Sequence, residues 1–332
     1  MKRLTVTAWM AAMAVLLAGP AKADTFAGTV YYTYYTGGAN VWKVNFSYND
    51  ATATASLNSP VHVATTNGAD GIIFAPNGNL LIGGQGSGNV YEVNPITGSL
   101  INTQATNTAS YHLTLDPNLG TVYTSSFGGP LQVLNLPVGS GYSTRSITGN
   151  ESGVTQVAFG TGGSVFYVNG NPNGFGNIGT VNLATGVTTR LYSGVQAAHG
   201  VIYDPFTGKM TFFGAGKTAT MNAADGSGLV SSDLEYGVGD FDQGAVDGMG
   251  HALVAGSGQL TFIDYSVSHD ITNPDHVFNF SGVEGISFSG IDDVAPLVGP
   301  GAPPTGDAPE PASLALLGLG AGMLSLIRRR KV

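Results

Sequence analysis

Carboxylate, imidazole and amide side chains recur along this sequence at nearly equal intervals. They stand at the start of a repeated segment whose copies begin at Asp70, Tyr111, Thr155, His199, Asp242 and Glu284. The next positions hold Gly71, His112, Gln156, Gly200, Gln243 and Gly285. Successive copies are 41, 44, 44, 43 and 42 residues apart. Carboxylates and imidazoles bind divalent cations, so these side chains, if brought together, would form a site for a cation or a polar ligand.

The elements that must position these residues can be read from the rest of each repeat. Every copy continues as a short apolar strand and a turn, and further strands and turns follow. Pairs such as Asn77-Gly78 and Thr97-Gly98 supply the positive φ that tight turns need. Four short strands in about 43 residues are typical of a β-propeller blade. We therefore predict an all-β fold, a six-bladed β-propeller, with a seven-bladed ring as the alternative.

The two ends of the repeated region predict how the ring closes. Residues 28–58 hold three strands but lack the opening strand of the repeat, whereas residues 284–291 resemble an opening strand with no others after it. Joining the two would complete one blade. Such closure removes the open sheet edges that promote aggregation.

In a propeller the innermost strands line a central channel, and the residues that start them meet at one mouth. We therefore expect a ligand or metal site there, with a divalent cation such as calcium as its cofactor. Its candidate residues are Asp70, His112, His199, Asp242 and Glu284. The alternative is a wet channel whose polar groups bind only water.

The other motifs in the sequence do not identify a more specific reaction or ligand. The acidic pairs Asp240/Asp242 and Asp292/Asp293 have carboxylates that could hold calcium, but they lack the order of an EF-hand loop. The sequence has no Gly-x-Ser-x-Gly elbow and no phosphate-binding Gly-Lys-Ser/Thr loop. We assign no catalytic residue.

Composition excludes several classes of function. The absence of cysteine rules out disulfides, thiolate metal sites and cysteine nucleophiles. Residues 24–308 contain five basic and twenty acidic residues, a net charge of −15. A domain this acidic repels phosphate backbones, so we expect no nucleic-acid partner.

The first 23 residues are typical of a secretory signal peptide. Lys2 and Arg3 precede a short apolar run, and the segment ends with the small residues Ala21 and Ala23 around Lys22. We expect signal peptidase to cleave after Ala23.

The last residues form a second distinctive segment. Pro309-Glu310-Pro311 precedes an uncharged stretch, 312–327, and then the basic residues Arg328, Arg329, Arg330 and Lys331. A helix over this stretch would span roughly 24 Å, with the basic cluster on the cytoplasmic side. The three parts in this order resemble the PEP-CTERM sorting signal. The resemblance implies processing by exosortase in a Gram-negative bacterium and delivery to the cell surface or an extracellular matrix.

These segments predict a modular chain: a signal peptide (1–23), a propeller (24–295), a Pro/Gly spacer (296–308) and a sorting signal with a transmembrane helix (309–332). The Gly71–Leu80 pattern also broadly resembles NHL-type and gluconolactonase-like propellers. We expect the propeller to be a binding or structural module on the surface, with exopolysaccharide as a candidate partner. The alternative is a secreted metal-dependent hydrolase or lactonase with its site at the channel mouth.

Overall fold

The computed structural model of the chain describes residues 25–35, 38–171, 173–233, 236, 240–300 and 302. The predicted signal peptide, with Ala21 and Ala23, and the sorting segment 309–332 lie outside the described residues. Within the described ranges, no helix has both the length and the apolar character of a membrane span.

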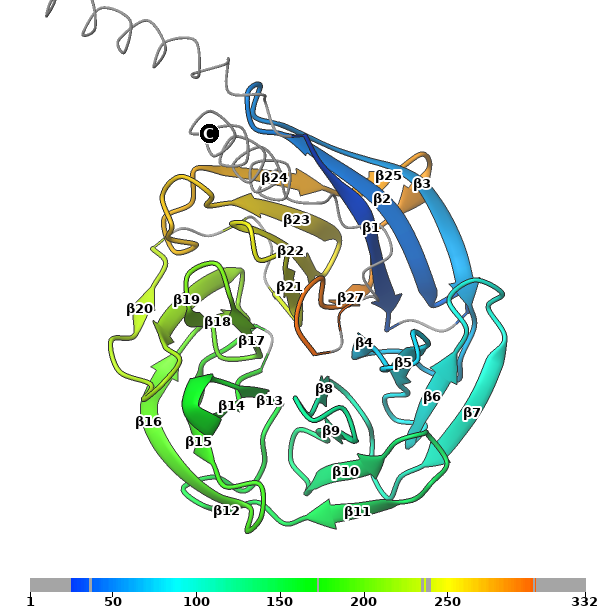
Figure 1. Ribbon diagram of the computed structural model, residues 1–332, viewed down its shortest axis with the longest axis vertical. Helices are drawn as coiled ribbons and strands as arrows, with labels where there is room; N and C mark the ends of the chain where they lie inside the picture. The colour runs from blue at the N-terminus through cyan, green and yellow to red at the C-terminus, as the bar shows by residue number, and fades with distance from the viewer. Residues whose placement is uncertain are drawn as a thin grey trace, which may run out of the picture.

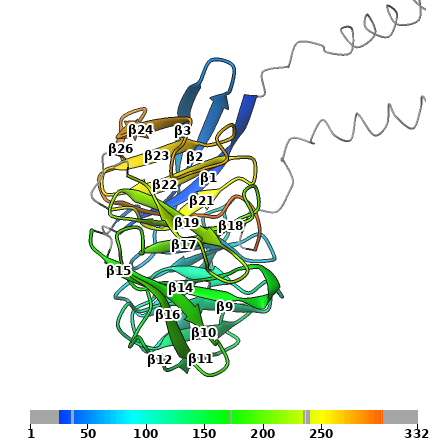
Figure 2. The ribbon, with the colours of Figure 1, turned by 90° about the vertical axis from the view of Figure 1, so that its left-hand side faces the viewer.

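Six mainly antiparallel sheets are arranged in a ring around a common axis (Figure 1). The innermost strands are β4 (Ile72–Phe74), β8 (Leu113–Leu115), β13 (Gln156–Phe159), β17 (Gly200–Asp204), β21 (Gly244–Val246) and β27 (Ile291–Val294). The fold is thus the predicted six-bladed β-propeller, and the seven-bladed alternative is wrong for the part of the chain that the structure describes. Figure 2 shows the same ring from the side.

Three further strands follow outwards in each blade. They are β5 (Leu80–Gly83), β6 (Asn89–Val93) and β7 (Leu100–Ala105); β9 (Thr121–Thr124), β10 (Leu131–Asn135) and β11 (Tyr142–Arg145); β14 (Val165–Val168), β15 (Gly176–Val181) and β16 (Val187–Val195); β18 (Lys209–Gly214), β19 (Lys217–Asn222) and β20 (Val230–Ser231); β22 (His251–Gly256), β23 (Gln259–Asp264) and β24 (His276–Phe280); and β1 (Thr25–Tyr34), β2 (Val41–Asn49) and β3 (Thr54–Ala64). The short strand β12 (Thr148–Gly149) pairs in parallel with β16.

Side-chain hydrogen bonds and glycines fix the turns between the strands. In the β6–β7 turn, Asn94 Oδ1 accepts hydrogen bonds from the backbone N–H groups of Ile96 and Thr97, both at 2.9 Å. Gly98 then adopts a φ of 71°, which side chains disfavour. The β15–β16 turn repeats this arrangement around Asn182. The same turn chemistry recurs because the same sequence pattern recurs.

Apolar side chains between neighbouring blades hold the ring together. Between the β1–β3 and β21–β24 blades, the rings of Tyr48 and Phe262 lie 4.9 Å apart, and both are buried. Burying each such side chain contributes about 1.5–3 kcal/mol relative to its exposure. The inner strands are buried on both faces, whereas outer strands such as β7 are largely exposed. The core therefore consists of six layers between blades.

The ring closes by pairing the two ends of the described chain, as predicted, but through a different strand. β27 pairs antiparallel with β1, with Tyr32 opposite Val294 and Tyr34 opposite Ile291. Most of the segment 284–291 predicted for this role instead lies in a small hairpin, formed by β25 (Gly282–Val283) and β26 (Ile286–Ser287), and in the turn after it. Of the predicted segment, β27 contains Ile291 alone. Phe288 of this segment matched the repeat pattern but packs edge-on against Tyr32. The true closing strand was hidden because its central residues, Asp292 and Asp293, are acidic.

Candidate metal centre in the channel

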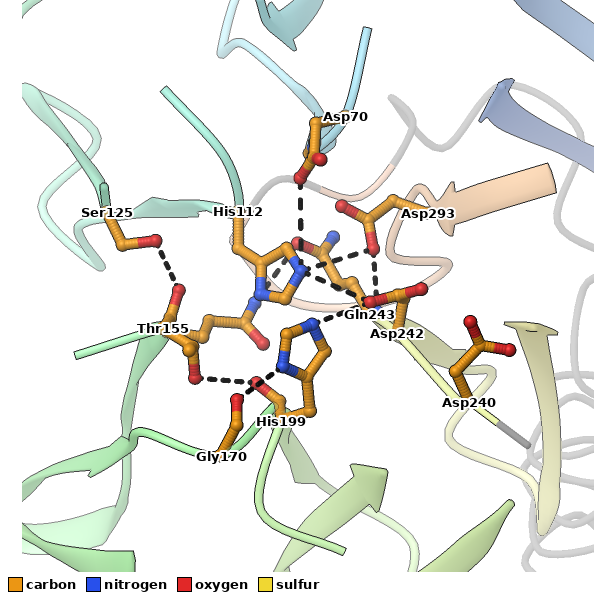
Figure 3. A network of polar contacts seen from close by, with 12 residues as sticks. Asp70, His112, Ser125, Thr155, Gly170, His199, Asp240, Asp242, Gln243 and Asp293 are labelled. Carbon is orange, nitrogen blue, oxygen red and sulfur yellow. Dashed lines mark hydrogen bonds and ion pairs between the residues drawn. The ribbon is translucent and has the colours of Figure 1, made fainter. Parts of the chain in front are cut away.

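Four of the five predicted site residues meet at the axis of the ring (Figure 3). Asp70 lies just before β4, His112 just before β8, His199 just before β17 and Asp242 just before β21. Their exposed fractions are 5%, 2%, 1% and 6% respectively. The propeller repeat places them together because each residue precedes an innermost strand on the same face of the ring. We call this face the site face.

Two glycines allow the inner strands to approach closely enough to form this cluster. A Cβ added to Gly71 would lie 2.5 Å from the carbonyl oxygen of Tyr111 and 2.7 Å from the Cα of His112. A Cβ added to Gly200 would lie 2.5 Å from the carbonyl oxygen of Asp242. Any side chain at these positions would force neighbouring blades apart where they carry His112 and Asp242.

His112 stands among three carboxylates. Its Nε2 atom lies 3.9 Å from Asp70 Oδ1, 3.8 Å from Asp242 Oδ1 and 3.7 Å from Asp293 Oδ1. These separations are too long for hydrogen bonds. The other ring nitrogen, Nδ1, is buried without a partner among the described residues.

His199 is held by the backbone of the neighbouring blade. Its Nδ1 lies 2.7 Å from the carbonyl oxygen of Gly170, which can only accept a hydrogen bond. Nδ1 must therefore carry a proton, and in the neutral ring Nε2 presents its lone pair. That Nε2 lies 2.6 Å from Asp242 Oδ1 but lacks the alignment of a hydrogen bond. In the neutral ring two electron-rich atoms therefore face each other at short range, whereas a protonated ring forms an ion pair with Asp242.

The closing strand adds two carboxylates that sequence reasoning left out of the cluster. Asp293 is fully buried, and its Oδ1 accepts a 2.7 Å hydrogen bond from the backbone N–H of Gln243. Its Oδ2 and the Oδ2 of Asp292 are buried without a hydrogen-bond partner. The adjacent acidic pair is the available signal in the sequence, but without the position of β27 it indicates no more than a weak calcium motif.

Glu284 does not join the cluster. It lies in the exposed turn between β25 and β26, where its Oε1 accepts a 3.1 Å hydrogen bond from the backbone N–H of Ser59. The repeat alignment placed it at the channel mouth because residues 284–288 imitate the pattern of an opening strand. The position belongs to the closing strand, which begins seven residues later at Ile291.

The pKa values of the carboxylates in the cluster are shifted in different directions. Burial raises the pKa of Asp70, and burial together with the charges of Asp70 and Asp242 raises the pKa values of Asp292 and Asp293 well above their usual range. Burial also opposes ionisation of Asp242, but attraction to His199 and His112 outweighs it and lowers its pKa. Asp242 is therefore the carboxylate best suited to bind a cation.

Aromatic rings and amides enclose the cluster. On the site face, Phe127 from the β9–β10 loop stacks on Tyr111 with ring centroids 4.0 Å apart, and lies 5.4 Å from the ring of His199. Phe127 has a φ of 59°, which is strained for a bulky side chain. Towards the other face, Gln156 Nε2 donates a 3.1 Å hydrogen bond to Gln243 Oε1 across the channel. A mainly apolar cavity of about 370 Å³ lies at these glutamines, between β8, β13, β17 and residues 296–300.

The fold is widely shared among solved structures. A chain in the nidogen/laminin complex aligns with a TM-score of 0.57 at 10% identity, covering 81% of this chain and 98% of that one. Virginiamycin B lyase from Staphylococcus aureus aligns with a TM-score of 0.53 at 9% identity, covering 83% and 94%. At such low identity the similarity concerns the propeller fold alone. The comparison with curated protein sequences gave no match.

The comparison with protein families concerns the other end of the molecule. Residues 307–331 match the family described as the PEP-CTERM protein-sorting motif. The chain carries a PEP-CTERM sorting motif. This match confirms the resemblance carried by Pro309, Glu310, Pro311 and the terminal arginines. The motif indicates an exported protein that exosortase processes for the cell surface.

The PEP-CTERM motif indicates where the protein is delivered but not what the propeller binds. The residues of the channel are the candidates for that chemistry. Among the described residues, two sets of donor atoms could hold a metal ion: His112, His199 and Asp242, or Asp70, His112 and Asp293. In each set all donor atoms lie within 4.8 Å of one another. His112 belongs to both sets, so it is the centre of the candidate site.

Proposed function

We propose that this PEP-CTERM protein is a surface binding module whose propeller presents its site face to extracellular polysaccharide. The observation that carries the proposal is the position of the chain ends. β1 and β27 are antiparallel, and the start of β27 lies beside the end of β1 at Tyr34. Thr25 and residues 296–300 therefore lie on the face opposite to the channel cluster. The spacer that leads to the sorting motif leaves from that opposite face.

A tether on one face directs the other face outwards. A chain held at the cell surface through its C-terminal segment would turn the opposite face of the ring towards the cell. The site face, with Tyr111 and Phe127 at the channel, would then meet the extracellular matrix. Aromatic rings provide apolar faces on which sugar rings stack.

The experiment compares aromatic variants of the purified full chain for binding to polysaccharides. The probes are extracellular polysaccharide from the producing bacterium and a panel of neutral and acidic polysaccharides. Phe127→Ala and Tyr111→Ala should each weaken binding roughly 2- to 10-fold, the range expected for one aromatic contact. Ile96→Ser is the matched control, because Ile96 is 89% exposed in the β6–β7 turn on the opposite face. Failure of the wild-type chain to bind any of these polysaccharides would refute the proposal.

The buried histidine and aspartate cluster favours a second candidate, a secreted metal-dependent hydrolase or lactonase. A metal ion held by imidazoles and carboxylates can activate water for hydrolysis. This candidate predicts turnover of lactones or glycosidic substrates by the full chain with added Zn²⁺ or Mn²⁺, and loss of turnover in His199→Ala. Absence of product from the wild-type chain under these conditions would leave the binding module as the better account.

A further inference from the structure

We propose that the channel cluster is a built site for one divalent transition-metal ion, held by the Nε2 atoms of His112 and His199 and by the carboxylate of Asp242. The three residues come from three blades, so one ion would tie together half of the ring at its axis. The inference rests on the channel geometry alone. It stands whether or not the site face binds polysaccharide.

The spacing of the donor atoms is close to that of a metal site. Bonds of 2.0–2.2 Å to nitrogen and oxygen place neighbouring ligands of a tetrahedral ion about 3.3–3.6 Å apart. His112 Nε2 lies 3.8 Å from Asp242 Oδ1 and 3.7 Å from Asp293 Oδ1. A shift of a few tenths of an ångström would bring His112 Nε2 and Asp242 Oδ1 to this ligand separation, whereas His199 Nε2 and Asp242 Oδ1, which lie 2.6 Å apart, would have to separate by about 0.7–1.0 Å. The third carboxylate near His112, that of Asp70, lies at 3.9 Å and belongs with Asp293 to the other set of donor atoms around His112.

The orphaned atoms indicate that a cation is needed. His199 donates from Nδ1 to a backbone carbonyl, the arrangement that metal-bound histidines use to orient their free nitrogen. That free nitrogen faces Asp242 Oδ1 at 2.6 Å with no hydrogen bond between them. A cation beside both atoms would accept the lone pair of the neutral imidazole and one of the carboxylate. Asp293 Oδ2 is a further buried acceptor without a donor.

The charge of the cluster points the same way. Asp70, Asp242, Asp292 and Asp293 are all at most 8% exposed. Within the described ranges, their ion-pair partners are histidines, and no lysine or arginine lies among them. Burying charged carboxylates without a cation costs several kcal/mol each. A divalent ion offsets that cost, whereas protons on the aspartates are the alternative that the experiment must distinguish.

The donor set selects the kind of metal. Calcium prefers six to eight oxygen ligands, whereas imidazole suits zinc, copper, iron and nickel. Two imidazoles with one carboxylate therefore favour a first-row transition ion over the calcium expected from the acidic sequence. Phe127 and Tyr111 cover the cluster on the site face, so the ion would be screened from bulk water.

The test titrates metal into the purified full chain after a chelator has removed bound ions. The probes are Zn²⁺, Co²⁺, Mn²⁺ and Ca²⁺, followed by calorimetry and, for Co²⁺, by visible absorption. We expect one Zn²⁺ or Co²⁺ per chain, with Ca²⁺ at least 100-fold weaker. His199→Gln and Asp242→Asn should each lower Zn²⁺ affinity more than 10-fold. The matched control is His62→Gln, since His62 is an exposed histidine on β3.

The Co²⁺ spectrum of the wild-type chain decides the question even if the variants fail to fold. Binding of one equivalent of Co²⁺ should produce the visible absorption of an ion of low coordination number with nitrogen and oxygen ligands. A folded wild-type chain that binds neither Zn²⁺ nor Co²⁺ would overturn the proposal and assign the aspartates protons instead. Binding that is unchanged in folded His199→Gln would also overturn it. Metal binding without polysaccharide binding would refute only the proposed function, and the reverse result would refute only the metal site.

Discussion

Replacing Gly200 by alanine tests how the ring assembles its channel. The added Cβ would lie 2.5 Å from the carbonyl oxygen of Asp242 and 3.2 Å from the Cα of Gln243. Real Cβ atoms do not approach backbone so closely, and backbone cannot rotate away as a flexible side chain can. The blades of β17 and β21 must therefore separate. Overpacking of this kind costs about 1–3 kcal/mol.

Chemical denaturation followed by circular dichroism measures this cost as a loss in the free energy of unfolding. Gly86→Ala is the matched control, because a Cβ at Gly86 would have no heavy atom within 4 Å and its φ is not in the positive range. The control should change stability by less than about 0.5 kcal/mol. If Gly200→Ala proved as stable as Gly86→Ala, the close approach of the inner strands would not be what limits this position.

Two further predictions concern the blade that closes the ring and its neighbour, the β21–β24 blade. Burial opposes the charged form of His251, but hydrogen bonding and attraction to Asp247, 2.6 Å away, outweigh it and raise the pKa of His251. A raised folded-state pKa stabilises the fold fully below the unfolded value near 6.5, and the effect disappears as pH rises through the folded value. The stability lost in His251→Gln should therefore be larger at pH 6 than at pH 9 in denaturant titrations, and an equal loss at both would contradict this. Phe288→Ala should cost about 3–5 kcal/mol, because its fully buried ring packs on Tyr32. Val267→Ala, at an 80% exposed position, should cost less than about 0.5 kcal/mol, and similar losses in both variants would refute the packing argument.

The propeller could be predicted because two separate patterns recur along the sequence, one in the spacing of the strands and one in the residues of the turns. The 41- to 44-residue spacing and the Asn-Gly and Thr-Gly turns each recur, so blade number and five of the six inner strands followed from them. The sixth inner strand did not, because its side chains serve the channel. Asp292 and Asp293 replace the apolar residues that mark other inner strands. Local pattern alone cannot distinguish an acidic pair in a solvated loop from one buried at an axis.

The same limit applied to the candidate site. His112, His199, Asp70 and Asp242 could be grouped from the repeat, since equivalent positions of a ring share one face. The fifth partner was wrong because it depended on the misaligned strand that contains Glu284. The hydrogen bond that orients His199 comes from Gly170, a loop residue outside the repeat alignment. Contacts of this kind depend on tertiary packing.

Anomalous X-ray diffraction from crystals of the zinc-loaded chain would test the channel site most directly. The account predicts a single strong zinc peak on the axis of the ring, about 2.0–2.2 Å from His112 Nε2 and from a carboxylate oxygen of Asp242. Density for water alone between these side chains, with no zinc peak, would contradict it.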